Sequence, residues 1–225
     1  MIKGKKIYLR LVREDDLAVL HQLLNDVEAA GAFWPVSLVP EATLRQRFQS
    51  NGMWSDEHGE LLICAEDDRI LGEIMYFATA RYMSELEIAY RIFRPEDRGF
   101  GATTEALGLL THFLFNFREI NRLRLMIDPD NIGSRRVAEK CGYTLEGTTR
   151  GCVFHHAAFH DMNVYAILKL AGPSPHPKMV RVRSSLSRSN MRRYSTKERP
   201  QGTMSSSFMV FSGFPGHHQR VTWYR

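Results

Sequence analysis

The feature that most constrains the fold is a change of hydrophobic period in the middle of the chain. Residues 86–93 form a mostly apolar run that stops before Pro95, which predicts a strand. Residues 101–117 then place apolar side chains on one side at helical spacing, and residues 123–127 predict a second strand. A further helix is expected at 132–141, closed by Gly142. This order indicates an α/β protein with a mixed sheet and helices on both faces.

Shorter elements flank this unit on both sides. In the early part of the chain we expect strands at 7–12, 61–65 and 69–80, with a tight turn at Asp67–Asp68, and helices at 14–25 and 43–49. In the late part we expect two strands, 144–150 and 161–168, joined by a long hairpin. The early strands therefore form antiparallel hairpins, and the strand–helix–strand unit follows them.

Residues 171–225 differ in composition from the rest of the chain. They hold ten Lys or Arg and one acidic residue, whereas residues 1–170 hold 20 basic against 24 acidic residues. Their Pro, Ser and Arg show no hydrophobic period, which is typical of segments that do not fold. We expect a folded domain at 1–170 and a basic, disordered tail at 171–225. Binding of nucleic acid by this tail is the less favoured alternative.

Composition also bounds the setting of the protein. The sequence has no run of about 18 apolar residues, so a membrane-spanning helix is not expected. Its three cysteines are not spaced as a CxxC pair. A reduced, cytoplasmic location and the absence of a metal site are the corresponding expectations.

The loop between the central strand and helix reads Arg98-Gly99-Phe100-Gly101-Ala102-Thr103. Free backbone N–H groups at a helix start attract anions, and the helix dipole adds partial positive charge. Glycines permit close approach of a phosphate, and an arginine supplies a neighbouring charge. A tight strand-to-helix turn would use the same residues, so the loop alone leaves both readings open.

This loop resembles the Q/R-x-x-G-x-G/A signature of the GNAT acetyltransferases, from which only Thr103 departs. Downstream, residues 128–143 (DPDNIGSRRVAEKCGY) are similar to a stretch of the branch that includes RimJ/RimL-type N-terminal acetyltransferases and SpeG-type polyamine acetyltransferases. The resemblance covers roughly residues 3–169. It implies the GNAT fold, with a mostly antiparallel sheet splayed at two parallel strands, here 86–93 and 123–127.

The resemblance also implies acetyl-CoA as co-substrate, held in the splay, with no metal. The implied cofactor-binding residues are Ile92, Phe93, Arg98, Gly99, Phe100, Gly101, Ala102, Thr103 and Asn131. Backbone groups near Ile92 and Phe93 would pair with the pantetheine arm, and the amides of 99–104 would hold the pyrophosphate.

Acetyl transfer to an amine requires a base, because an alkylamine has a pKa of roughly 10. We expect Glu87 in this role, with Glu73 and Glu85 as substitutes, or with Glu87 lying only on a solvated face. Ser134 is the acid that the resemblance implies, and capping of a helix turn is its alternative role. Tyr143 is more typical of core packing.

The sequence therefore predicts an N-acetyltransferase in which a primary amine attacks acetyl-CoA directly. Acids on the acceptor side suit a cationic amine, such as a polyamine, an aminoglycoside-like compound or a protein N-terminus. The aromatic and Met residues of the early helix-loop region line the acceptor cleft or pack against the core, namely Phe33, Trp34, Met53 and Trp54. The alternatives are a non-catalytic acyl-CoA-binding module and tail-driven nucleic-acid binding, and a homodimer is left open.

Overall fold

The computed structural model describes residues 1–80 and 82–169, so the predicted tail lies outside the described residues. The strands of this part are β1 (Ile2–Lys3), β2 (Ile7–Leu11), β3 (His58–Ala65), β4 (Ile70–Ala78), β5 (Glu85–Ile92), β6 (Arg122–Ile127), β7 (Thr144–His155) and β8 (Ala158–Leu168). They form one sheet in the order β1-β2-β3-β4-β5-β6-β8-β7. Every neighbouring pair is antiparallel except β5 and β6, which run parallel.

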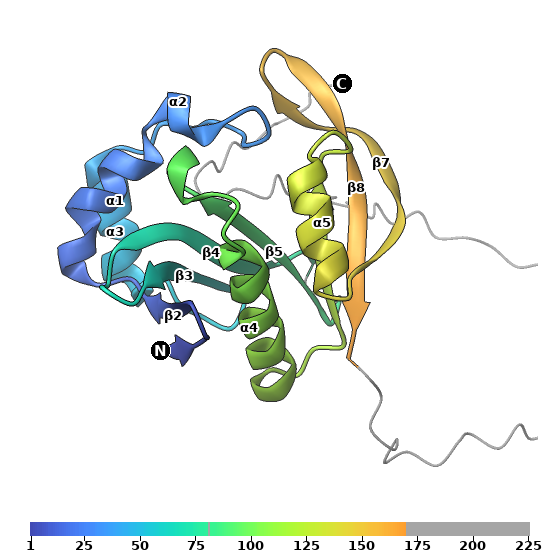
Figure 1. Cartoon of the computed structure of the whole chain (residues 1–225), viewed down its shortest axis with the longest axis horizontal. Coiled ribbons are helices and arrows are strands. Elements are labelled where there is room, and N and C mark those ends of the chain that lie inside the picture. The colour runs from blue at the N-terminus through green and yellow to red at the C-terminus, as the bar shows by residue number, and fades with distance from the viewer. Residues whose placement is uncertain (81, 170–225) are drawn as a thin grey trace, which may run out of the picture. The chain divides into compact units, whose positions relative to one another are not determined.

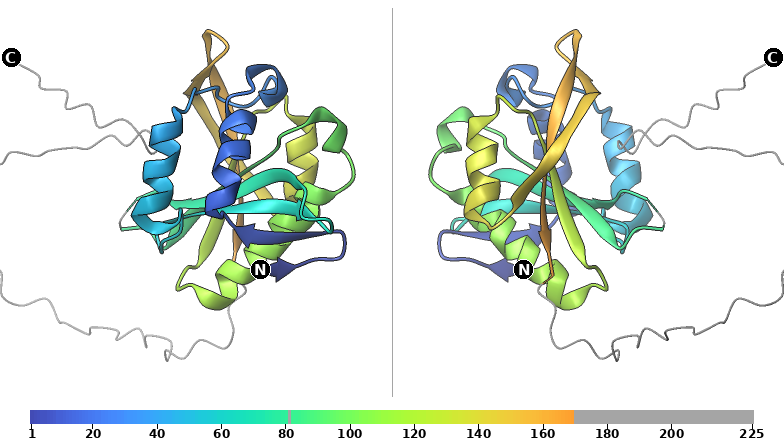
Figure 2. Two further views of the ribbon diagram at one scale, coloured as in Figure 1. Left: turned by 90° about the vertical axis from the view of Figure 1, so that its left-hand side faces the viewer. Right: turned by 90° about the vertical axis from the view of Figure 1, so that its right-hand side faces the viewer.

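Helices cover both faces of this sheet (Figures 1 and 2). They are α1 (Leu17–Leu24), α2 (Val27–Ala30), α3 (Glu41–Asn51), α4 (Ala102–Phe117) and α5 (Ile132–Lys140). Successive β3 residues show the two layers: Leu61 and Ile63 join the core under α4, whereas Leu62 and Cys64 join the core under α1 and α3. The predicted mixed sheet with helices on both faces is therefore confirmed. None of the helices in residues 1–80 and 82–169 has the length and apolar character needed to cross a membrane.

The parallel pair separates along its length. β5 and β6 are in register only at Glu85–Arg122, Leu86–Leu123 and Glu87–Arg124. Beyond this point β5 continues to Ile92 against β4, and β6 continues to Ile127 against β8. The two strands thus diverge into a V, as the family resemblance implied.

The β7–β8 hairpin differs from the sequence expectation. β7 extends to His155 and β8 begins at Ala158, so a tight turn at His156 and Ala157 replaces the expected long connection. Both turn residues have left-handed φ values, 46° and 60°. β7 lies at the sheet edge and its first nine residues are exposed, so its side chains lack the apolar alternation that marks a half-buried strand. The short helix α2 was also missed, because four residues are too few to show a period.

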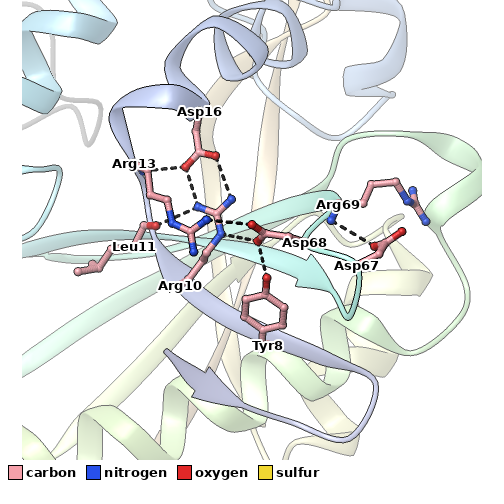
Figure 3. A network of polar contacts seen from close by, with 8 residues as sticks. All are labelled: Tyr8, Arg10, Leu11, Arg13, Asp16, Asp67, Asp68 and Arg69. Carbon is pink, nitrogen blue, oxygen red and sulfur yellow. Dashed lines mark hydrogen bonds and ion pairs between the residues drawn. The ribbon is translucent and has the colours of Figure 1, made fainter.

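A buried arginine joins the start of the first helical segment to the β3–β4 turn (Figure 3). The Arg10 guanidinium donates to both carboxylate oxygens of Asp16, at 2.6 and 2.9 Å, and its Nε donates to Asp68 at 2.9 Å. Asp68 occupies the left-handed position of the predicted Asp67–Asp68 turn, with φ 65°. Hydrogen bonds from the Tyr8 hydroxyl and from Arg10 lower the pKa of Asp68 to about 2.

Substitution of Asp16 should therefore destabilise the fold. Asp16→Asn removes one charge of a pair whose side chains are only 6% and 11% exposed. We expect the free energy of unfolding to fall by about 3 kcal/mol, because Arg10 would stay buried with only Asp68 as a charged partner. Urea denaturation measures the loss, with Asp15→Asn, an exposed neighbour, as the control. Equal losses in the two variants would contradict this role of the ion pair.

Candidate active site

The loop between β5 and α4 is built around two left-handed glycines. Gly99 has φ 88° and Gly101, the N-cap of α4, has φ 85°. A Cβ added at either position would meet no atom within 4 Å. The backbone conformation, and not crowding, is therefore what requires glycine at both positions.

The same loop presents the free start of α4 to an open surface. The N–H of Glu105 makes the first backbone bond of the helix, to the Gly101 carbonyl, which leaves the amides of 102–104 without a carbonyl inside the helix. Phe100 is 69% exposed, and Thr103 lies half-buried in the first turn. The Glu105 carboxylate accepts the Lys6 N–H at 3.1 Å and fixes this end of the helix to the β1–β2 turn. Free amides at a helix start are groups that can bind an anion.

Arg98 is oriented differently from the sequence expectation. Its Nη2 donates to the Ala29 carbonyl at 2.6 Å and to the Ile92 carbonyl at 3.4 Å. The guanidinium thus joins the end of β5 to α2, and in this conformation its charge is not extended over the loop.

The open edge of β5 explains which backbone groups face the splay. The Phe93 N–H donates to the Leu71 carbonyl of β4 at 2.9 Å, so this group is not free for a ligand, contrary to the expectation for Phe93. Because hydrogen-bonding direction alternates along a strand, the backbone groups of Ile88, Tyr90 and Ile92 face β6 instead. Of the two residues predicted to pair with pantetheine, Ile92 therefore has the suitable orientation.

The start of α5 closes the other side of the V. Asn131 is the N-cap of this helix, and its side chain accepts the Ser134 N–H at 3.0 Å. The Ser134 Oγ lies 2.9 Å from the hydroxyl of Tyr90 on β5. Burial raises the pKa of Tyr90, which keeps that hydroxyl protonated. Sequence reasoning missed Tyr90, because alternation placed it on the helix-covered face without indicating its partner.

Three carboxylates lie on the opposite face of the sheet, where α1 and α3 pack. Glu87 pairs with Arg124, whose Nε and Nη2 lie 2.9 and 2.8 Å from Glu87 Oε2. Burial raises the pKa of Glu87, and Arg124 only partly offsets this shift. Glu73 pairs with Arg91 at 2.9 Å, and Glu85 pairs with Arg122 and Arg124. Of the three carboxylates, Glu87 lies at the point where the parallel pairing of β5 and β6 ends.

Of the other sequence candidates, three lie in the core and one contacts an arginine. Tyr143 is 3% exposed and its hydroxyl lies 2.8 Å from Thr111 Oγ1, so it packs behind α4 as expected. Met53 is 2% exposed and Trp54 packs edge-on against Tyr76, which places both in the core. Trp34 instead lies against the guanidinium of Arg91, at 4.7 Å.

A pocket of about 280 Å³ lies between the α2 region and the tip of the β7–β8 hairpin. Its lining residues are Val27, Val36, Phe154, His155 and His156. The two segments lie at the same end of the molecule in Figure 1. The sequence predicted only a long hairpin connection here, so sequence reasoning did not find this pocket.

Comparison with known proteins agrees with this geometry. Residues 6–144 match the family model described as an acetyltransferase (GNAT) domain. The chain is 27% identical to a probable N-acetyltransferase, YjcK, of Bacillus subtilis, over 75% of this chain and 97% of that protein. It is 25% identical to the ribosomal-protein-serine acetyltransferase of Escherichia coli, over 72% and 93%.

A solved structure shows the same fold. Spermidine N-acetyltransferase from Vibrio cholerae, in complex with CoA and spermine, superposes with a TM-score of 0.65 at 17% identity, covering 74% of this chain and 97% of that one. The splayed strands, the glycine loop at the start of α4 and the family match over most of the folded part together identify the chain as a member of the GNAT acetyltransferase family.

Proposed function

We propose that this protein transfers the acetyl group of acetyl-CoA to the primary amine of a cationic acceptor, by direct attack while both reactants are bound. The observation that carries the proposal is the V between β5 and β6, which has an anion site at the start of α4 and a carboxylate, Glu87, where the strands part. Holding both reactants in one cleft removes the need for a covalent enzyme intermediate.

In this proposal, acetyl-CoA is bound mainly by backbone groups. The pyrophosphate accepts hydrogen bonds from the backbone amides at the start of α4, and the two left-handed glycines keep these amides directed outward. The pantetheine arm follows the β5 edge at Tyr90 and Ile92. Asn131 supports the thioester end indirectly, because it caps the helix that carries Ser134.

The chemistry needs a base, an oxyanion donor and a donor to the leaving sulfur. Glu87 removes a proton from the ammonium, directly or through a water molecule, which makes the nitrogen lone pair available for attack on the thioester carbon. A β5 N–H in the splay stabilises the tetrahedral oxyanion. The C–S bond then breaks, and the Ser134 hydroxyl, held by Tyr90 at 2.9 Å, donates to the sulfur as thiolate character develops.

Charge on the acceptor side favours a cationic amine. Glu73, Glu85 and Glu87 share the sheet face opposite α4, and each is paired with an arginine. A cationic amine would compete with these arginines for the carboxylates. The names of two relatives, a ribosomal-protein-serine acetyltransferase and a spermidine N(1)-acetyltransferase of Escherichia coli, support testing both N-terminal and polyamine acceptors.

The test is a panel of amines with detection of free CoA thiol. We expect at least one acceptor among spermidine, an aminoglycoside and peptides with free N-termini to release CoA above the hydrolytic background. Binding of acetyl-CoA is measured in parallel by calorimetry. Tight binding without turnover on every amine would contradict the enzymatic proposal and would favour a non-catalytic acyl-CoA-binding module.

A further inference from the structure

Three metal-ligating side chains meet beside the pocket at the hairpin tip, outside the proposed catalytic groups. Asp128 directly follows β6 and opens the turn that leads to α5. Its Oδ1 accepts the Asp130 N–H at 2.8 Å, so that oxygen is already engaged. Its Oδ2 faces two imidazoles, with His160 Nδ1 at 3.3 Å and His155 Nε2 at 3.8 Å.

The two histidines lie on either side of the hairpin turn and stack on each other. Their ring centroids are 3.7 Å apart and the ring planes differ by 13°. His155 is only 6% exposed. Neither of its ring nitrogens has a hydrogen-bond partner among the described residues, and the same holds for His160 Nε2. Buried polar atoms are nearly always paired, so this group of unpaired nitrogens calls for a ligand.

The donor set identifies the kind of ligand. One ligand atom from each of the three residues lies within 4.8 Å of the others. Two imidazole nitrogens with one carboxylate oxygen suit Zn²⁺ and related divalent transition metals, whereas Mg²⁺ and Ca²⁺ prefer oxygen.

We propose that Asp128, His155 and His160 bind one divalent transition-metal ion of the Zn²⁺ class. The imidazole lone pairs lie in the ring planes, so the two rings must turn out of their stack to share one ion. The bound ion would join the end of β6 to the β7–β8 hairpin, and would stand at the wall of the pocket that His155 lines. This proposal does not depend on acetyl transfer.

No sequence pattern indicated this site, and a metal was not expected. That expectation rested on cysteine spacing and on the family resemblance, whereas Asp128 lies far from His155 and His160 in the sequence. His160 and Asp128 come together because β8 runs beside β6.

The test uses the untagged, metal-free full-length protein and equilibrium dialysis against Zn²⁺. The chain has nine histidines, so the result depends on comparing matched variants. His155→Phe keeps a flat ring in the buried stack and removes both nitrogens. His156→Phe, at the exposed neighbouring position, is the control. We expect the wild type and His156→Phe to bind one Zn²⁺ tightly, and His155→Phe to bind it at least about 100-fold more weakly.

Two further measurements keep the test independent of folding. Saturating Zn²⁺ should raise the Tm of the wild type and of His156→Phe but leave that of His155→Phe unchanged. Asp128→Asn keeps an acceptor for the Asp130 N–H but loses the charge, and should weaken binding at least tenfold. Co²⁺ should give an absorption spectrum of low-coordinate nitrogen and oxygen ligation that disappears in His155→Phe. Equal Zn²⁺ binding in the wild type, His155→Phe and Asp128→Asn would overturn the proposal.

Discussion

Replacing Gly99 and Gly101 together by alanine is expected to raise the KM for acetyl-CoA by about 100-fold or more. Both glycines have φ above 80°, where an alanine costs about 1–2 kcal/mol, so the loop would relax into another conformation. The outward N–H groups would then lose their common direction. Each hydrogen bond to a charged phosphate contributes about 1.5–3 kcal/mol, so losing two of them accounts for the expected change.

The helix itself offers the control for this experiment. Gly108 lies in α4, and a Cβ added there also meets no atom within 4 Å, but its φ is not in the left-handed region. Gly108→Ala should leave the KM for acetyl-CoA unchanged and raise the free energy of unfolding by about 0.5–1 kcal/mol. Steady-state kinetics with the best acceptor measures KM, and calorimetry measures the dissociation constant. A double variant with the wild-type KM would exclude the loop as the pyrophosphate site.

The predictable parts of this molecule are those where one segment carries its own signal. The glycine loop and α4 follow each other in sequence, so their local chemistry predicted a turn into a helix before any tertiary contact was considered. An anion site and a simple strand-to-helix turn both remained possible interpretations of that loop. The β3–β4 turn was predicted on the same basis, and Asp68 has the left-handed backbone that such a turn requires. The mostly antiparallel sheet and the splay of its two parallel strands followed from the family resemblance, whereas the strand order was not predicted.

The parts that could not be predicted depend on pairing between distant segments. Tyr90 acquires its role from Ser134, which α5 brings to it across the V. Arg98 acquires partners on α2, a helix too short to be recognised from its period. The hairpin strands are exposed along one edge, so their length is set by pairing with each other and not by an apolar pattern. Each case needs a contact that no single segment encodes.

The ion pairs at the base of the V connect the fold to the chemistry. Arg122 and Arg124 of β6 contact Glu85 and Glu87 of β5 across the last paired residues of the two strands. These ion pairs join the two strands where they are hydrogen-bonded to each other, whereas beyond Glu87 and Arg124 the facing backbone groups of the two strands are not paired with each other. A base placed at this junction is fixed by the same contacts that define the cleft. Glu87 is therefore a better candidate than Glu73, whose partner Arg91 lies across the antiparallel β4–β5 pair and not across the parallel junction of β5 and β6.

Glu87→Gln is expected to lower kcat by about 100- to 10,000-fold, the usual contribution of a positioned base. In the wild type, kcat/KM should rise with pH as Glu87 loses its proton, above the ordinary range for a glutamate because burial raises its pKa. The variant should lose this rise. Glu85→Gln and Glu73→Gln are the matched controls, and both should keep it. A pH profile lost in either control but kept in Glu87→Gln would assign the base to that residue instead.

The stability of Glu87→Gln separates a base from a purely structural ion pair. A raised pKa means that the carboxylate is less favourable in the folded protein than in the unfolded chain. The corresponding stability is present below the ordinary glutamate pKa and is lost as pH rises through the folded-state pKa. A neutral glutamine should therefore leave Tm near pH 7 unchanged or slightly raised. Arg124 would keep an ion-pair partner in this variant, because Glu85 lies 3.4 Å from it. A fall in Tm with a higher KM for acetyl-CoA and an unchanged pH profile would show that Glu87 only holds the strands together.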